Sequence, residues 1–274
     1  KVIFAIVMSI FGLCAVPQIT FAAEEGASVY AFPDRFMLRA GTYFVDSTNT
    51  QFSINSNDGI GAGSSIDFKK DLGGDERDTI PRIDAYYRFN DYHRIDFTAF
   101  SISRAGRRTL TGEIVIGDTT YPVDETLSSE IKYTLYKVGY SYSFYRSPKV
   151  ELSFSAGLNI TKYDLSFSDQ TGANAQAAGV TVPLPVFGLR MGYMLSPKWS
   201  MQYVVEAFAI KLEDKFRGSL LNFELNTEYR LFKNFALGVG IASLGLDAEV
   251  TSSDWRGSVT DRYAGFTAFG TLYF

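Results

Sequence analysis

An alternation of apolar and polar residues is the feature that most constrains the fold of this chain. From Leu221 to Leu231 the sequence reads Leu-Asn-Phe-Glu-Leu-Asn-Thr-Glu-Tyr-Arg-Leu, with apolar side chains at most odd positions and polar ones at even positions. A period of two places the two sets on opposite faces of a β-strand. Similar runs recur along the chain, with turn residues and no helical segments between them. This pattern predicts an all-β chain and favours a closed antiparallel transmembrane barrel, with lipid outside and polar side chains inside.

The first residues predict a secretory leader. Lys1 precedes an apolar run that ends at Val16, and small residues follow, so we expect a signal peptide over residues 1–22. Residues 23–35 are then a short periplasmic segment, and residues 36–274 are the barrel. Cys14 lies in the leader and follows Leu13, whereas a lipid-anchored cysteine normally follows Gly or Ala. The mature chain therefore has no cysteine for a disulfide or a thiolate metal site.

Composition agrees with a barrel and excludes several other classes. No run after residue 23 is long enough for a membrane helix. Aromatic residues make up 15% of the chain while hydrophobic residues make up an ordinary 46%, as expected when half of each strand is polar. The net charge of −4 gives no indication of nucleic-acid binding.

Short and long connections alternate along the chain, which sets the strand count. Four short turns are expected at 90–92, 145–149, 196–198 and 232–234, and longer polar stretches at 104–126, 168–180, 212–219 and 246–260. Outer-membrane barrels have short periplasmic turns and long outer loops. The implied strands are 36–54, 79–90, 93–103, 127–144, 150–167, 182–195, 199–211, 219–231, 235–245 and 260–274. We therefore predict about ten strands.

Two other even counts remain open. Twelve strands would result if the segment Ser64–Leu72, which we interpret as a hairpin extension in the first outer loop, spans instead. Eight would result if one clear hairpin fails to span. A soluble β-sandwich is the competing fold. It does not account for the aromatic residues that gather beside the short turns, such as Tyr87, Phe144 and Trp199, where an interfacial girdle is expected.

At this level the chain resembles small bacterial outer-membrane β-barrel proteins, loosely the OmpA transmembrane domain and OmpW-like groups. The end of the chain carries the most specific likeness: an alternating strand that finishes in an aromatic residue, with Thr267, Gly270, Leu272 and Phe274 near the positions of an assembly signal. Gly270 falls one place later than the usual glycine. The resemblance implies the outer membrane of a Gram-negative cell, with the barrel assembly machinery and periplasmic chaperones as transient partners. It implies no shared activity.

Charged residues on the inward positions are the main candidate site. Both signs occur in similar number, and opposite charges in a narrow lumen are expected to pair because an isolated buried ion is costly. The predicted lumen charges are Arg82, Asp84, Arg88, Arg94, Asp96, Lys137, Glu151, Arg190, Glu206, Glu224, Glu228 and Arg230.

Little in the sequence supports catalysis. The only histidine, His93, is expected at the inner rim, away from the outer face where a histidine-dependent site would be needed. Glu224 and Glu228 offer paired acids, but their regular spacing favours interior packing. We therefore predict no enzyme, no cofactor and no metal site.

Outside the barrel, Arg104, Arg107 and Arg108 form a basic cluster where a strand leaves the membrane, a height at which lipopolysaccharide phosphates are expected.

The leading functional prediction is a structural or narrow-pore outer-membrane protein whose lumen is largely closed by ion pairs. The alternative is a surface-binding protein, an adhesin or receptor, that acts through its extracellular loops at 104–126 and 246–260. A third hypothesis, an envelope hydrolase, depends on His93, Glu224 and Glu228. Outer-membrane lipid and lipopolysaccharide are the expected surroundings in each case.

Overall fold

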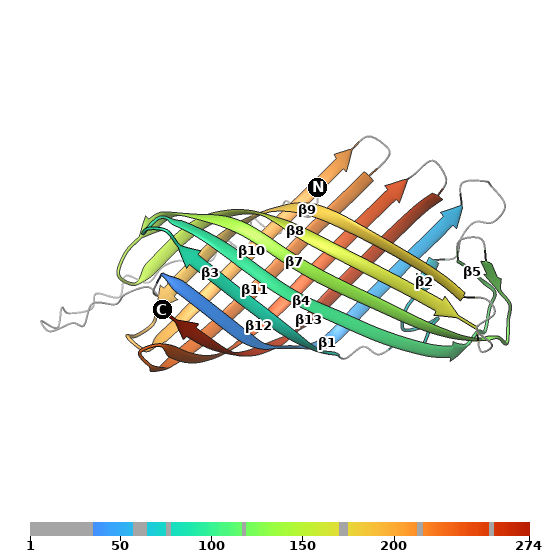
Figure 1. The fold of residues 1–274 in the computed structure, drawn as a ribbon, viewed down its shortest axis with the longest axis horizontal. Coiled ribbons are helices and arrows are strands. Elements are labelled where there is room, and N and C mark those ends of the chain that lie inside the picture. Colours follow the sequence, from blue (N-terminus) through green and yellow to red (C-terminus); the bar gives the residue numbers. More distant parts are fainter. Residues whose placement is uncertain are drawn as a thin grey trace, which may run out of the picture.

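The described part of the chain forms a closed antiparallel barrel (Figure 1). The computed structural model describes residues 35–56, 65–74, 78–116, 119–169, 175–212, 216–251 and 255–274. The predicted signal peptide, and the segment 23–35 except for Arg35, lie outside the described residues. Ten strands form the wall, so the predicted all-β class, closure and strand count are confirmed.

Each wall strand pairs with the next along the chain, and the last pairs with the first. The wall consists of β1 (Phe36–Ser56), β3 (Asp78–Arg88), β4 (His93–Thr109), β7 (Thr126–Arg146), β8 (Val150–Ser168), β9 (Ala175–Met194), β10 (Trp199–Leu212), β11 (Phe216–Phe232), β12 (Phe235–Thr251) and β13 (Trp255–Tyr273). Closure runs along the whole of β1 and β13, from Met37 opposite Tyr273 to Ser56 opposite Trp255. The barrel therefore has no open edge at this seam.

The short connections are tight turns at one end of the barrel. Between β3 and β4, the amide N–H groups of Tyr92 and His93 donate to the side-chain oxygen of Asn90, at 2.9 and 3.0 Å. Between β9 and β10, the N–H of Leu195 donates to the carbonyl of Trp199 at 2.9 Å. Asn and Ser stabilise such turns through their own side chains. All four predicted short turns join consecutive wall strands, and this end is the inner, periplasmic one by the barrel rule.

Short strands at the opposite end cover the mouth. β2 (Ser65–Asp67) adds to β1 through residues 51–53, so the predicted hairpin extension is correct and this segment does not span. β5 (Ile114–Ile116) and β6 (Thr119–Tyr121) form a separate hairpin between β4 and β7, visible at the end of the barrel in Figure 1.

The wall strands reach further outward than their sequence indicates. β4 extends to Thr109 where 103 was expected, and β9 begins at Ala175 where 182 was expected. The long loops predicted at 104–126, 168–180, 212–219 and 246–260 are therefore wrong in extent, because only 110–125, 169–174, 213–215 and 252–254 separate the wall strands. The reason is physical. Beyond the membrane the outer face of a strand meets water, so the outward apolar side chains by which the strand is recognised in the sequence stop before the strand does.

Exposed apolar side chains on the wall are confined to its inner part. On β7 the outward side chains from Phe144 to Tyr136 are 43–51% exposed, and the column then continues with exposed Lys132. On β8 the corresponding column ends at Ile160 and continues with Lys162. These belts cover about ten residues of a strand, the length that a tilted strand needs to cross a bilayer. The outward position of the apolar residues agrees with a barrel that has lipid outside.

The remaining part of the wall extends beyond this belt. A strand such as β7, with 21 residues, is about 70 Å long at about 3.4 Å per residue, or about 50 Å along an axis tilted by about 45°, against an apolar band of about 25 Å. The outer half of the wall, which we call the projecting wall, therefore stands clear of the hydrocarbon.

Candidate functional site

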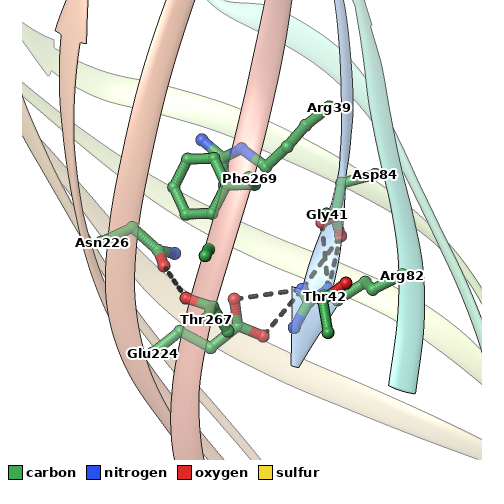
Figure 2. Close-up of a pocket in the computed structure, with 10 residues that line it drawn as sticks. Arg39, Gly41, Thr42, Arg82, Asp84, Glu224, Asn226, Thr267 and Phe269 are labelled. Carbon is green, nitrogen blue, oxygen red and sulfur yellow. Dashed lines mark hydrogen bonds and ion pairs between the residues drawn. The ribbon is translucent and has the colours of Figure 1, made fainter. Parts of the chain in front are cut away.

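Arg82 lies at the centre of a charged layer in the lumen. Its guanidinium is 2.9 Å from Asp84 on its own strand and 2.9 Å from Glu224 on β11, and Figure 2 shows it between the two carboxylates. Thr98 donates to Asp84 at 2.7 Å and Asn222 donates to Glu224 at 3.2 Å. Every charge in this group is largely buried, and each carboxylate has more than one donor. Such saturation is what makes buried charges tolerable.

A second set of ion pairs extends the charged layer across the barrel. Lys137 on β7 is 2.8 Å from Glu206 on β10, and Arg190 on β9 is 3.2 Å from the same carboxylate. Arg190 also lies 3.5 Å from Asp96 on β4, which accepts a hydrogen bond from Ser141. The Lys137–Glu206 and Arg190–Asp96 pairs connect strands that are not neighbours in the wall, so they bridge the lumen.

The other predicted lumen charges lie nearer the inner rim. Arg88 is 2.8 Å from Glu151, and Arg94 is 3.0 Å from Asp96. Glu228 binds Arg39, which sequence reasoning missed although its alternation with Met37 places it inward. The predicted lumen charges from Arg82 to Glu228 all take part in these ion pairs. The guanidinium of Arg230 lies over the Tyr273 ring at 4.4 Å and donates to the carbonyl of Lys233 at the rim.

Small residues make room for these long side chains. A Cβ atom on Gly238 would lie 2.2 Å from the ring of Phe269, over which the Arg39 guanidinium stacks at 4.2 Å. The pocket drawn in Figure 2, between Arg39, Phe269 and Arg82, has a volume of about 10 Å³. That is about the space of a single water molecule. The charged layer is therefore nearly filled.

An apolar layer follows further outward, where the alternation predicted polar side chains. The inward column of β7 changes from Lys137 to Leu135 and Tyr133, and the column of β4 changes from Asp96 to Ile102. The Tyr133 ring lies 4.9 Å from the ring of Tyr163 across the strand pair. The buried members are Tyr43, Val45, Ile80, Ile102, Tyr133, Leu135, Tyr163, Leu184, Val186, Leu220, Ala242, Leu246 and Tyr263. The expectation of a polar interior thus fails in the outer half of the lumen.

Arg104 lies inside the barrel, which corrects its assignment to a lipopolysaccharide contact. Its side chain donates to the hydroxyls of Thr50, at 2.6 Å, and Tyr263, at 3.3 Å, and it is only 5% exposed. β4 continues past the expected end at 103, and position 104 continues its inward column. The side chain of Arg104 therefore points into the lumen. Arg107 and Arg108 are exposed, and Arg108 donates to the carbonyl of Lys70.

An outer cap completes the layers. Phe52, Ile66, Phe68, Leu72, Leu110, Ile114, Tyr121, Leu127, Ile131 and Phe167 form a second buried apolar cluster, to which β2 and the β5–β6 hairpin contribute. Asp67 fixes the turn after β2 by accepting from the amides of Lys69 and Lys70. Partial burial alone would raise the pKa of Asp67, but these donors, the side chain of Gln51 and the charge of Lys70 hold its pKa below the ordinary value.

The residues considered for catalysis each contact other groups of the barrel. His93 lies at the inner rim, where its ring nitrogen contacts the hydroxyl of Tyr140 on the outer face of the wall. Glu224 is held by Arg82, while Glu228 accepts from Thr271 and Tyr273 as well as Arg39. Within the described ranges no three metal-type ligands gather in one place. The same ranges contain no helix with the length and hydropathy to cross a membrane.

The chain end lies in the closing seam. Phe274 exchanges backbone hydrogen bonds with Phe36, at 2.9 and 3.0 Å, and their rings lie 5.9 Å apart. Leu272 and Phe274 are exposed on the outer surface, whereas Thr267 points inward and donates to Asn226. Gly270 pairs with Ala40 and Leu237 on the two flanking strands. The predicted assembly-signal residues therefore share one strand at the inner end.

Comparison with solved structures identifies the class of fold. The outer-membrane protease OmpT from Escherichia coli is similar to this chain with a TM-score of 0.55 and 9% identity, over 87% of this chain and 97% of that one. The transport unit of the autotransporter AIDA-I from Escherichia coli gives 0.39 and 8%, over 99% and 97%. The P. putida toluene transporter TodX gives 0.34 and 10%, over 89% and 91%. No family model and no curated protein sequence matches the chain.

The geometry and the likeness to OmpT agree on the class. This chain has the fold of a bacterial outer-membrane β-barrel, with ten antiparallel strands and a closing β1–β13 seam. Within that class it is a barrel whose lumen is filled in layers. At 9% identity the likeness to a protease concerns the fold alone.

Proposed function

We propose that the protein is an integral outer-membrane barrel with a structural role and a lumen that is closed at rest. One observation carries this proposal: a charged layer, an apolar layer and an outer cap follow one another along the same lumen. An open pore needs a continuous wet path, whereas the rings of Tyr133 on β7 and Tyr263 on β13 lie 6.3 Å apart across this lumen. In the alternative, a narrow conduit, the charged layer, the apolar layer and the outer cap would all have to open.

Conductance measurements test closure directly. We expect the folded protein, inserted in a planar bilayer, to give no reproducible unit conductance steps. Folding of the same preparation is checked by the faster migration of unboiled protein on a gel. Regular small steps from that preparation would contradict the closed barrel and support the narrow pore.

Surface binding is the second candidate function, and the projecting wall favours it. A depression of about 440 Å³ lies beside Lys211, Arg217 and Glu249, and another of about 630 Å³ lies beside Arg107 and Glu130. Both are on strands rather than on free loops, so a ligand would meet a preformed surface. We propose that any host, phage or matrix ligand binds this wall.

The exposed cations also suit the lipid around them. We propose that lipopolysaccharide phosphates contact Arg107 and Arg108, now without Arg104, and that insertion proceeds through the assembly machinery and periplasmic chaperones after secretion. Replacing Arg107 and Arg108 together by glutamine is expected to weaken binding of purified lipopolysaccharide to the folded barrel several-fold. Unchanged binding would remove these two residues from the contact. Lys198→Gln, at the inner end of the barrel, is the matched control. Arg104→Gln does not serve as a control because the Arg104 side chain is buried.

We further propose that the barrel acts without catalysis. Its support is the position of His93 at the inner rim, remote from the outer surface where a substrate would arrive. The variants His93→Ala and Glu224→Gln are expected to leave any lipid or peptide hydrolysis measured with the wild type unchanged.

A further inference from the structure

A small cavity near the inner end of the lumen, which we call the inner vestibule, is lined by several arginine side chains. Its volume is about 60 Å³, and its lining includes Arg39, Arg88, Arg94, Arg190, Glu151 and Glu228. Four guanidinium groups and two carboxylates line this small space, and two further carboxylates, Asp96 and Glu206, pair with Arg94 and Arg190. Each guanidinium therefore has a carboxylate partner, and a further anion would bind through the donors that these ion pairs leave unused.

Both carboxylates of the vestibule already have their donors. Glu151 accepts two hydrogen bonds from Arg88, at 2.8 and 3.1 Å, and a third from Ser143. Glu228 is bound by Arg39 and by two hydroxyl groups. Neither is left to neutralise a further cation.

Arg94 is the cation with donors to spare. Its Nε atom is 3.0 Å from Asp96, and its guanidinium stacks over the Tyr86 ring at 4.6 Å. Among the described residues, no hydrogen-bond acceptor meets its terminal nitrogens. The residue is only 7% exposed, and it lines the vestibule.

Tyr86 supplies a second, independent sign of a missing ligand. Its hydroxyl is buried and has no hydrogen-bond partner among the described residues, although the residue is only 5% exposed and lines the same cavity. Buried hydroxyl groups are nearly always hydrogen-bonded in native structures, and leaving one unpaired is unfavourable. An acceptor entering the vestibule would satisfy both Tyr86 and Arg94.

We propose that the inner vestibule is a binding site for an oxyanion of the phosphate class, entered from the periplasm. A guanidinium matches two oxygens of such an anion with parallel N–H donors, and the Tyr86 hydroxyl donates to a third. A cavity of about 60 Å³ has space for a few water molecules, which suits a small anion such as one phosphate group. The ligand is either a free anion or the phosphate of a lipid headgroup from the inner leaflet.

Calorimetric titration with inorganic phosphate tests the site on the folded full-length barrel in a phosphate-free detergent. Saturable binding is expected, with the affinity lowered about tenfold or more in Arg94→Gln, since a charged donor is lost. Asp96 keeps Arg190 and Ser141 in that variant, so the fold is expected to persist. Tyr86→Phe removes only the hydroxyl and is expected to weaken binding a few-fold.

Arg146→Gln is the matched control. Arg146 lies at the same rim and binds Asp91, but it does not line the vestibule, so phosphate affinity should stay at the wild-type value. Absence of saturable binding to the folded wild type, or equal affinities in wild type and Arg94→Gln, would overturn the proposal. Repeating the titration in phospholipid nanodiscs distinguishes the sources: unchanged affinity identifies a free anion, and competition by the lipid identifies a headgroup.

Discussion

Replacing Arg82 by alanine is expected to destabilise the folded barrel by roughly 3–5 kcal/mol, because Asp84 and Glu224 would remain buried without their cation. The side chains of all three residues are at most 14% exposed, and Arg82 lies 2.9 Å from both carboxylates. The free energy of unfolding is measured by urea titration of the barrel in lipid vesicles, followed by tryptophan fluorescence and by the gel shift between folded and unfolded protein.

Two further variants make this expectation specific. Arg146→Ala also removes an ion pair, but Asp91 is 78% exposed, so the cost is expected to stay below about 1 kcal/mol. The triple variant Arg82→Met, Asp84→Asn and Glu224→Gln removes the unpaired charges together with their partner, and most of the lost stability is expected to return. An Arg82→Ala cost no larger than that of Arg146→Ala would show that the charged layer does not hold the lumen together.

Placing a charge on the apolar belt is expected to cause the second large effect. Val239 is 57% exposed on β12, four residues beyond the inner turn. Val239→Arg is expected to destabilise the barrel by about 2–4 kcal/mol, since the charge would lie near the middle of the bilayer. Ser166→Arg is the control, because Ser166 faces outward on the projecting part of β8. Its cost is expected to be within about 0.5 kcal/mol. Equal costs in the same urea titration would contradict the membrane position assigned here.

The wall of this barrel was predictable because its signals are local. The period of two assigned inward and outward faces on every strand, and Asn or Ser with Pro marked the inner turns, as the contacts of Asn90 show. The same period placed Arg82, Lys137 and Glu206 in the lumen. What the sequence did not provide was the partner of each charge. Arg82 and Glu224 are 142 positions apart, and their meeting depends on the tilt and stagger of the strands, which no local pattern encodes.

The outer half was mispredicted for a related reason. Beyond the belt, outward residues such as Lys132 and Lys162 are polar, while inward ones such as Tyr133 and Tyr163 are apolar. The alternation is therefore inverted relative to the membrane part. A prediction that treats apolar positions as outward consequently ends the strand too early. Arg104 was placed in a loop by this rule and is instead a buried donor to Thr50.

This inversion has a consequence for how the protein can change over time. The projecting wall obeys the rules of a water-soluble β-barrel, with its own apolar core in the apolar layer and the outer cap. Its outward side chains are under no demand from hydrocarbon, and the core that holds them does not depend on the bilayer. Substitutions on that outer surface are therefore decoupled from insertion, so the part of the molecule seen from outside the cell is free to vary while the anchor beneath it stays the same.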